Sequence, residues 1–218
     1  FAEQEAKRLD RAVKRAMDIA GSLAALVVLA PLMLLIAALV KATSNGPAVF
    51  RQKRVGQYGR EFTFLKFRSM YADCSDGIHQ AYVTALIAGK QPGEPTASEA
   101  PYKLTNDPRI TPLGRFLRKT SLDELPQFLN VLAGDMSLVG PRPPVPYEFR
   151  AYDLWHRRRL LSVKPGITGL WQVHGRSKVT FDEMVRLDLK YAESWSPWLD
   201  LKILLKTPKA VLSGTGAY

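Results

Sequence analysis

The feature that most constrains this chain is an apolar run of 22 residues, Ile19 to Val40, that carries no charged side chain. A helix needs about 20 such residues to cross the hydrocarbon core of a bilayer. The run is longer than the roughly 7–15 residue apolar core of a signal peptide, and it lacks the polar stripe of a soluble surface helix. A fully buried core helix is the alternative, but the length favours a membrane segment.

Basic residues flank this run on both sides. Five precede it and five follow it: Lys7, Arg8, Arg11, Lys14 and Arg15, then Lys41, Arg51, Lys53, Arg54 and Arg60. Because Lys and Arg favour the cytoplasm, a helix that crosses once should be basic on one side only. Pro31 lies near the middle, where a proline removes one helix hydrogen bond. These features predict a re-entrant helix broken at Pro31, with both ends cytoplasmic; a kinked single span is the alternative.

The net charge of +11 is concentrated near this segment, since residues 1–70 hold 12 Lys and Arg against 5 Asp and Glu. Basic residues beside an apolar segment favour anionic lipid as a partner. A nucleic-acid binder would instead interleave basic residues with stacking aromatics away from lipid, so no nucleic acid is expected. The single cysteine, Cys74, is compatible with a body that faces the cytosol. Because the chain begins with Phe1 rather than Met, we expect a segment upstream of it.

The remaining chain predicts short elements. Ala48–Arg54 and Glu61–Arg68 surround a glycine-containing turn and indicate a β-hairpin. Capping and breaking signals predict helices over residues 112–119, 125–133 and 181–193, and another that begins at Ser196-Pro197. Residues 89–101 are rich in Pro, Gly, Ser and Thr, and we expect a mobile loop over about residues 75–101.

The last helix has a mixed surface. Lys202, Lys206 and Lys209 recur at helical spacing, and tryptophan and leucine fill much of the remainder. This pattern is typical of a helix in the membrane interface, and equally of a core helix with solvated lysines. The predicted fold is mainly α with a small β-hairpin. Residues 1–42 form the basic helix and re-entrant membrane segment, and residues 43–218 form a compact body with interfacial amphipathic helices.

The densest chemical signal is TSLDELPQ, residues 120–127. Pro126 is tolerated only near a helix start, so Asp123 and Glu124 must lie in or just before the first turn. There, unpaired N–H groups and the helix dipole keep carboxylates ionised and attract phosphate. The structural alternative is a capping box between Ser121 and Glu124.

Arginines around these two carboxylates favour the chemical reading. Arg115 and Arg118 share one face of the preceding helix, and Arg142 lies in the stiff segment Gly140–Pro144. A guanidinium fork suits phosphate, and Mg²⁺ takes one or two carboxylates together with phosphate oxygens. The residues therefore predict a magnesium–diphosphate site at Asp123 and Glu124. For any single arginine, a surface ion pair is the competing explanation.

Long blocks of this sequence resemble the monotopic phosphoglycosyl transferases, bacterial enzymes that start glycan assembly on undecaprenyl phosphate. The matching blocks run in order almost from end to end: KRAMDIAGS (14–22), residues 46–70, residues 107–144, PGITGLWQVHGRS (165–177) and SGTGAY (213–218). Two departures are Ala30-Pro31, where the family usually has Ser-Pro, and the long segment from about Ser75 to Pro101.

The resemblance implies that residues 43–218 are a compact cytosolic catalytic body at the cytoplasmic face of the bacterial inner membrane. It also implies a UDP-sugar donor and a polyprenyl phosphate acceptor. It implies that Asp123 is the nucleophile, forming an aspartyl phospho-sugar with release of UMP, while Glu124 handles the proton and the metal. Mg²⁺ would be bound at Asp123, and Arg118 and Arg142 would hold phosphate. The resemblance also covers the basic positions Lys66 and Arg176.

Two other classes of protein fit parts of the pattern. A membrane-surface scaffold explains the charge and the interfacial helices, but it has no need for paired carboxylates at an arginine-rich helix start. A nucleic-acid binder does not explain the apolar anchor. The sequence is compatible with a homo-oligomer, and it identifies neither the sugar nor the glycan pathway.

Overall fold

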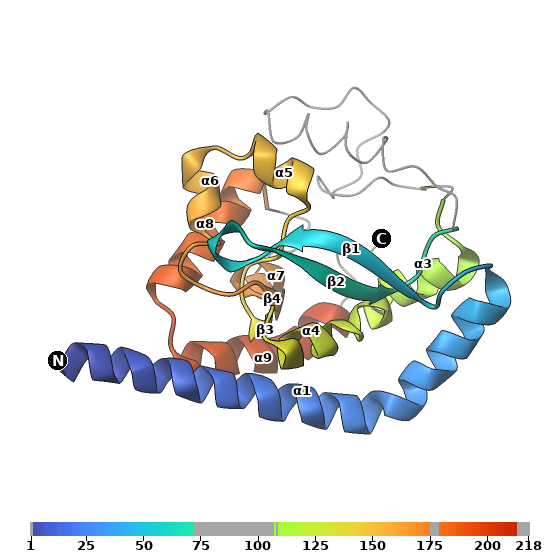
Figure 1. The fold of residues 1–218 in the computed structure, drawn as a ribbon, viewed down its shortest axis with the longest axis horizontal. Coiled ribbons are helices and arrows are strands. Elements are labelled where there is room, and N and C mark those ends of the chain that lie inside the picture. Colours follow the sequence, from blue (N-terminus) through green and yellow to red (C-terminus); the bar gives the residue numbers. More distant parts are fainter. Residues whose placement is uncertain (1, 72–106, 108, 175–178, 213–218) are drawn as a thin grey trace.

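The computed structural model describes residues 2–71, 107, 109–174 and 179–212, and side chains from residue 9 to residue 211 (Figure 1). The expected mobile loop at 75–101 lies outside the described residues, and so does Arg176. The described part is mainly helical, with two small two-stranded sheets, as predicted for the helices and the hairpin. The second sheet was not predicted.

A single long helix, α1 (Ala2–Thr43), contains the whole apolar run. Figure 1 shows that α1 changes direction along its length. Pro31 lies within the helix, and sharp bends in helices usually lie at a proline. The expected break therefore takes the form of a bend in a continuous helix. Among the described residues, α1 alone is long and apolar enough to cross a membrane, with a mean hydropathy of 2.9 in its most apolar window, 11% of which is buried.

Polar side chains fix the N-terminal part of α1 to the body. Lys14 donates to Asp200 at 2.5 Å and to the carbonyl of Val139 at 3.2 Å. Arg15 donates to the last carbonyls of α4 (Gln127–Ala133), at 2.6 and 2.8 Å. Asp18 accepts from both the hydroxyl of Ser137 and the amide of the next residue, each at 2.9 Å. The start of the apolar run is thus held by charge-assisted hydrogen bonds inside the protein.

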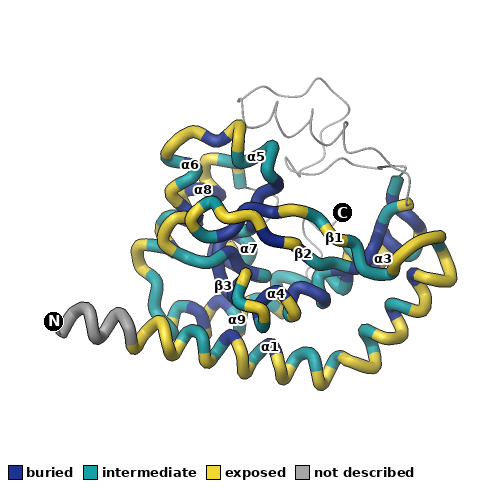
Figure 2. The backbone as a smooth tube through the Cα atoms, in the orientation of Figure 1, coloured by how far each residue is buried: buried dark blue, intermediate teal, exposed yellow. Residues whose placement is uncertain are grey.

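The C-terminal part of α1 is held by apolar packing. Ile36 and Val40 are buried in one cluster with Phe67 and Leu117, and the two leucines on either side of the predicted carboxylate pair, Leu122 and Leu125, pack against this cluster. The middle of the helix is much more open, as Figure 2 shows. Its exposed apolar side chains include Leu23, Val27, Val28, Leu34, Leu35 and Leu39.

The charge count at the two flanks needs correction. Lys14 and Arg15 are bonded within the fold, and Arg54 is only 8% exposed. These three charges therefore stabilise protein contacts, and they carry no weight as a signal of orientation in the membrane. The stronger structural observation is that both ends of the apolar run dock on one body.

The predicted hairpin is confirmed as β1 (Val49–Val55) and β2 (Glu61–Phe67), joined by the short helix η1 (Gln57–Gly59). The strands are antiparallel, with Arg54 opposite Phe62 and Gln52 opposite Phe64. Residues that pair directly across two strands share a face of the sheet. One face of the hairpin therefore carries Phe50, Gln52, Arg54, Phe62, Phe64 and Lys66.

The helix α3 (Pro112–Lys119) is confirmed with the predicted cap, since the Thr111 hydroxyl accepts from the amide of Gly114 at 2.9 Å. Gly114 allows α3 to approach the end of β2 closely, because a Cβ there would lie 2.0 Å from the carbonyl oxygen of Ser69. Two elements follow, the 3₁₀ turn η2 (Leu122–Glu124) and α4 (Gln127–Ala133), which ends at Gly134 in the left-handed conformation, φ 93°. The predicted start of α4 at Leu125 is two residues early.

Two three-residue strands, β3 (Ser137–Val139) and β4 (Gly166–Thr168), pair in parallel. Gly140 and Gly166 permit this pairing, because a Cβ on Gly166 would lie 2.0 Å from the amide nitrogen of Gly140. The main core surrounds this pair, with Phe62, Phe64, Met136, Leu138, Leu170, Tyr191 and Ile203 among its buried residues. The pairing places the segment after β3 beside the segment that follows residue 165.

The remaining helices are α5 (Pro146–Ala151), α6 (Leu154–Arg158), α7 (Leu170–His174), α8 (Phe181–Glu193) and α9 (Pro197–Leu212). The prediction of α8 is confirmed at both ends, and α9 begins where expected. A buried ion pair joins the end of α6 to α8, where Arg159 donates to Asp188 at 2.7 Å and to the Tyr152 hydroxyl at 2.7 Å. Both side chains of the pair are 1% exposed.

The outer surface of α9 combines lysines with apolar side chains. Ile203 is buried, whereas Trp198 and Leu205 are 61% and 72% exposed beside the exposed Lys202 and Lys206. The ammonium of Lys202 lies 5.4 Å from the centre of the Trp198 ring. The alternative of a core helix with solvated lysines does not account for these exposed apolar residues, so the surface keeps the composition of an interfacial helix.

Candidate functional site

The two predicted carboxylates occupy the turn η2 directly before α4. Asp123 is 8% exposed, whereas the side chain of Glu124 is 28% exposed. Ser121 adopts the left-handed conformation, with φ at 57°, and its side chain makes no capping hydrogen bond. The capping-box alternative is therefore wrong. The adjacent carboxylates have different surroundings, as expected for two residues with different roles.

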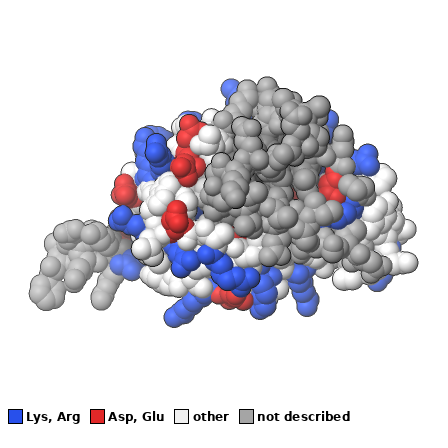
Figure 3. All heavy atoms as spheres, turned by 90° about the horizontal axis from the view of Figure 1, so that it is seen from above, with Lys and Arg blue, Asp and Glu red and all other residues white. Residues whose placement is uncertain are grey.

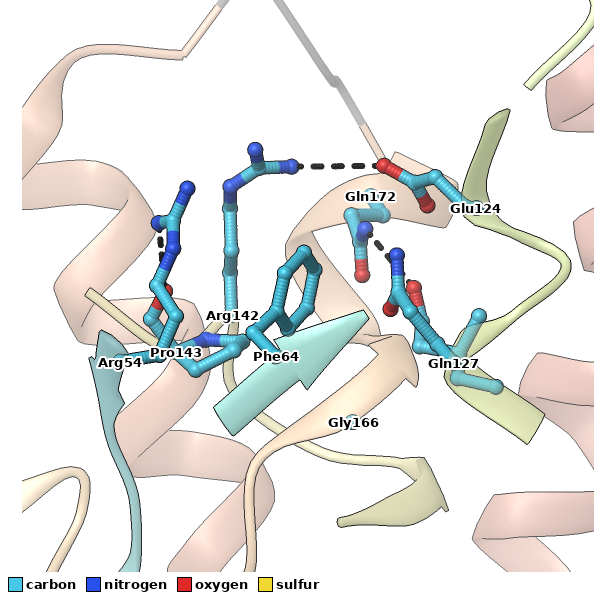
Figure 4. Close-up of a pocket in the computed structure, with 9 residues that line it drawn as sticks. Arg54, Phe64, Glu124, Gln127, Arg142, Pro143, Gly166 and Gln172 are labelled. Carbon is cyan, nitrogen blue, oxygen red and sulfur yellow. Dashed lines mark hydrogen bonds and ion pairs between the residues drawn. The ribbon is translucent and has the colours of Figure 1, made fainter. Parts of the chain in front are cut away.

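Three predicted cations surround this turn. The guanidinium of Arg142 lies 3.7 Å from the Glu124 carboxylate (Figure 4). Arg118 donates through Nε to the Ser69 hydroxyl at 2.8 Å. Burial lowers the pKa of Lys66 to about 8, the charge of Arg118 lowers it further, and the carboxylate of Asp123 opposes the shift. Burial likewise lowers the pKa of Arg118, again against the influence of Asp123. Lys66, Arg118 and Asp123 thus lie within one electrostatic neighbourhood.

A narrow pocket with a volume of about 10 Å³ lies beside this cluster and opens to solvent. Its lining comes from the hairpin, η2, α4, β4 and α7, and from the segment after β3: Arg54, Phe64, Glu124, Gln127, Arg142, Pro143, Gly166, Ile167 and Gln172. Figure 4 shows Arg142 and Glu124 facing each other on one side of this space. The pocket lining therefore combines charged side chains with the neutral amides of Gln127 and Gln172.

Arg54, predicted above to flank the membrane segment, instead lines this pocket. It donates to the carbonyl of Pro143 at 2.9 Å, and its guanidinium lies 5.2 Å from the centre of the Phe64 ring. Burial and the nearby charge of Arg142 lower its pKa to about 10. Its contact with Pro143 ties the hairpin to the segment that carries Arg142. The register of the hairpin, with Arg54 opposite Phe62, would have indicated this position.

The other predicted site residues do not all reach this cluster. Arg115 is exposed on α3, and it is not among the described residues that line the pocket. Arg176 lies outside the described residues. Gln127 and Gln172 were missed as site residues, although both belong to blocks that carry the family resemblance.

The donor atoms present fit Mg²⁺ only when a substrate contributes. Among the described residues, no group of three or more His, Cys, Asp and Glu side chains could hold a metal ion. Asp123 and Glu124 supply two carboxylates, and Mg²⁺ in phosphate-transfer sites is usually held by one or two carboxylates, waters and substrate phosphates. The residues thus fit a magnesium ion bound together with a diphosphate.

Comparison with known proteins gives a consistent picture. The profile of one protein family, described as bacterial sugar transferase, matches residues 9–214. The chain is 48% identical over 205 residues to "Galactosyl transferase CpsE" of Streptococcus agalactiae, covering 94% of this chain and 43% of that protein. It is 46% identical over 216 residues to "Undecaprenyl-phosphate galactose phosphotransferase" of Salmonella typhimurium, covering 98% of this chain and 43% of that protein.

A third relative is named for a different sugar. "Undecaprenyl-phosphate glucose phosphotransferase" of Komagataeibacter xylinus is 41% identical over 222 residues, covering 96% of this chain and 37% of that protein. The chain thus spans less than half the length of these three relatives. Every residue of the pocket and of the cation cluster lies within the family match.

Proposed function

This chain belongs to the bacterial sugar transferase family, and we propose that it transfers a hexose-1-phosphate from a UDP-sugar to undecaprenyl phosphate, releasing UMP. The observation that carries the proposal is the almost buried Asp123 among Lys66, Arg118 and Arg142. Such a cluster suits a diphosphate approached by an anionic nucleophile. The names of the relatives support the class of donor group and the acceptor lipid.

The proposed reaction has two displacements. The carboxylate of Asp123 attacks the sugar-bearing phosphorus, and the bond from that phosphorus to the bridging oxygen breaks, so that UMP leaves with the electron pair. An oxygen of undecaprenyl phosphate then attacks the same phosphorus, and the Asp123 carboxylate departs. An acyl phosphate is reactive enough for this second step. One site can thus serve a soluble donor and a membrane-bound acceptor in turn.

Each charged side chain around Asp123 has its own role in the proposed reaction. Arg142 and Arg118 bind the phosphate oxygens, and Lys66 reduces the repulsion between Asp123 and the diphosphate. Glu124, more exposed than Asp123 and paired with Arg142, accepts the proton that undecaprenyl phosphate gives up as its oxygen attacks. Asp123 and Glu124 would hold Mg²⁺ together with diphosphate oxygens, and the bound ion supplies further neutralisation of charge.

Turnover of a panel of donors tests this function. The purified chain with Mg²⁺ and undecaprenyl phosphate should release UMP from UDP-galactose, UDP-glucose or an N-acetylated UDP-hexose, and should form the corresponding lipid diphosphate sugar. Absence of UMP release with every donor would contradict the proposal. The panel also identifies the sugar, which differs among the relatives.

Lys66 gives a prediction for the pH dependence. Its pKa of about 8 means that the ammonium charge is lost as the pH rises through this value, so kcat/KM for the donor should fall there. Lys66→Arg should move this fall to higher pH, because a guanidinium stays charged. If kcat/KM of Lys66→Arg fell at the same alkaline pH as that of the unchanged chain, the fall would belong to a group other than Lys66.

Unfolding does not account for such a fall. Because the pKa of Lys66 is lower in the folded chain than the ordinary value of 10.5, the folded state releases its proton first. Stability linked to this group therefore increases as the pH rises between about 8 and 10.5. The midpoint of thermal unfolding, measured across the same pH range, separates the two effects.

Arg142→Lys should lower kcat/KM by roughly tenfold to a hundredfold, equivalent to about 1.5–3 kcal/mol for one charge-assisted hydrogen bond. A planar fork holds two phosphate oxygens together, whereas an ammonium is a point charge on a flexible stem. Arg150→Lys, an exposed change on α5, is the matched control. If the turnover of Arg142→Lys were close to that of the control, Arg142 would stabilise its loop and would not bind phosphate.

We also propose that α1 enters the membrane and returns to the cytoplasmic side. Its two ends dock on one body while its middle exposes apolar side chains, which supports a re-entrant helix over a span. The exposed lysine and tryptophan side chains of α9 would lie in the adjacent interface. Figure 3, which views the described residues from the side away from α1, shows Lys and Arg side chains along one edge of the surface with Asp and Glu among them.

Cysteine labelling in intact cells tests this topology. Single cysteines near residues 10 and 45 should both be protected from an impermeant reagent applied outside. Pro31→Leu should shift part of the population to a crossing helix, because a straight apolar helix of about 20 residues is long enough to cross. Outside labelling of either site in the unchanged chain would establish a single span.

A further inference from the structure

Two glutamines of the pocket have no part in the proposed phosphate chemistry. Gln127 is the first residue of α4 and is 2% exposed. Gln172 lies on α7. Both line the pocket that Glu124 and Arg142 also line, and Figure 4 shows both side chains reaching into that region. Neither carries a charge, so neither is suited to balancing a diphosphate.

Their hydrogen bonding is incomplete. Gln172 donates through Nε2 to the carbonyl of Ile167 at 3.2 Å, but its Oε1 is buried without a partner. Among the described residues, the Gln127 side chain forms no hydrogen bond, although this side chain is almost fully buried. An unsatisfied buried polar group costs about 1–3 kcal/mol, so folded proteins rarely keep one without a use. The unpartnered Oε1 of Gln172, with the Gln127 amide lining the same pocket, indicates a polar ligand.

The position of the glutamines narrows the chemistry of this ligand. Gln127 follows Asp123 by four residues along the chain, and it lines the same pocket as Glu124, the neighbour of Asp123. Lys66, Arg118 and Arg142 are the charged groups suited to binding phosphate. The uncharged glutamines are therefore expected to bind a neutral part of the ligand. The ring of Phe64 has the Arg54 guanidinium 5.2 Å from its centre, which disfavours a nucleobase stacked on that face.

We propose that Gln127 and Gln172 bind hydroxyl groups of the hexose and hold it during both displacements. A hydroxyl donates one hydrogen bond and accepts others. The free Oε1 of Gln172 accepts from one hydroxyl, and the amide of Gln127 can both donate and accept. This inference rests on the proposed function, and it adds a sugar subsite that keeps the phospho-sugar in place after UMP has left.

Replacement by methionine, which has a similar length and no amide, tests the subsite. Gln127→Met and Gln172→Met should each raise KM for the UDP-sugar by about tenfold, the equivalent of one hydrogen bond with its unpaired partner. The inhibition constant of UMP, which has no sugar, should stay at its original value. Gln57→Met is the matched control, since the Gln57 amide donates to Ser162 outside the pocket.

Equal weakening of UMP and UDP-sugar would overturn the proposal and assign the glutamines to the nucleotide. An unchanged KM for the UDP-sugar together with an unchanged inhibition constant of UMP would overturn the proposal as well. The glutamines would then have only a structural role. Gln127→Asn and Gln172→Glu, which keep a polar end, are to be measured beside any methionine variant that fails to fold. They should retain the preference among UDP-hexoses better than methionine does.

Equilibrium binding separates a failure of this inference from a failure of the proposed function. UDP-hexose and UMP are titrated into the chain carrying Asp123→Asn, for which no turnover is expected, with and without each methionine change. Selective loss of the affinity added by the hexose supports the subsite even if the acceptor lipid is misassigned. If the hexose adds no affinity before the glutamines are changed, the subsite is wrong.

Discussion

Asp123→Asn is expected to abolish both UMP release and lipid product formation, by roughly 10⁴-fold or more, the scale seen when a catalytic nucleophile is removed. Asparagine keeps the shape of the side chain, but its amide oxygen is a poor nucleophile at phosphorus. Because asparagine has nearly the size and shape of aspartate, this change should leave the turn η2 intact. Thermal unfolding of the variant provides the check.

The decisive measurement uses a donor radiolabelled in the sugar, with no lipid present. Label should appear on the protein at residue 123 and disappear when undecaprenyl phosphate is added. Glu124→Gln should slow turnover severely while some labelled protein still forms, because the nucleophile is present. Label retained by Asp123→Asn, or kinetics that require donor and lipid together, would mean direct transfer, with Asp123 as a metal ligand.

The largest effect on stability is expected from the buried ion pair between α6 and α8. Arg159→Met should lower the free energy of unfolding by about 3–5 kcal/mol, because the Asp188 carboxylate would lose its buried partner. The double change Arg159→Met with Asp188→Leu should recover much of this loss. Urea unfolding of the three variants in one detergent measures the difference. Equal stability of Arg159→Met and the unchanged chain would contradict this account.

The pH dependence of this variant has a definite sign. Burial raises the pKa of Asp188 to about 6, although Arg159 opposes the shift, so removing Arg159 should raise it further. A carboxyl with a raised pKa binds its proton more tightly when folded than when unfolded, where the value is 3.8. The stability of Arg159→Met should therefore fall as the pH rises from about 4 through its folded pKa. The stability deficit is then smallest in acid.

Local signals in the sequence predicted the elements that local interactions form. Thr111-Pro112 caps α3, and the turn chemistry between residues 56 and 59 identifies the hairpin. Pro126 correctly limited Asp123 and Glu124 to the turn before α4. The β3–β4 pair escaped prediction because each strand has three residues, and the pairing depends on two glycines 26 positions apart.

The candidate site was only partly predictable for the same reason. Arg54 was counted with the membrane flank because its burial depends on strand register and on Pro143, far along the chain. The pairing of Arg115 with Arg118 assumed that helical spacing decides which side chains act together. Arg118 instead reaches Ser69, while Arg115 is exposed to solvent. The partners of Lys14 and Arg15 could not be identified from the sequence either, because they are far along the chain and come close only when α1 packs on the body.

The packing of Ile36 and Val40 beside Leu122 and Leu125 joins the end of α1 to the turn that carries Asp123. If α1 lies in the bilayer as proposed, its depth of insertion fixes the height of Asp123 above the acyl chains. The acceptor phosphate must meet the carboxylate at that height. Bilayer thickness should thus control the rate of the second displacement, while formation of the phospho-sugar from the soluble donor proceeds at the same rate in thin and thick membranes.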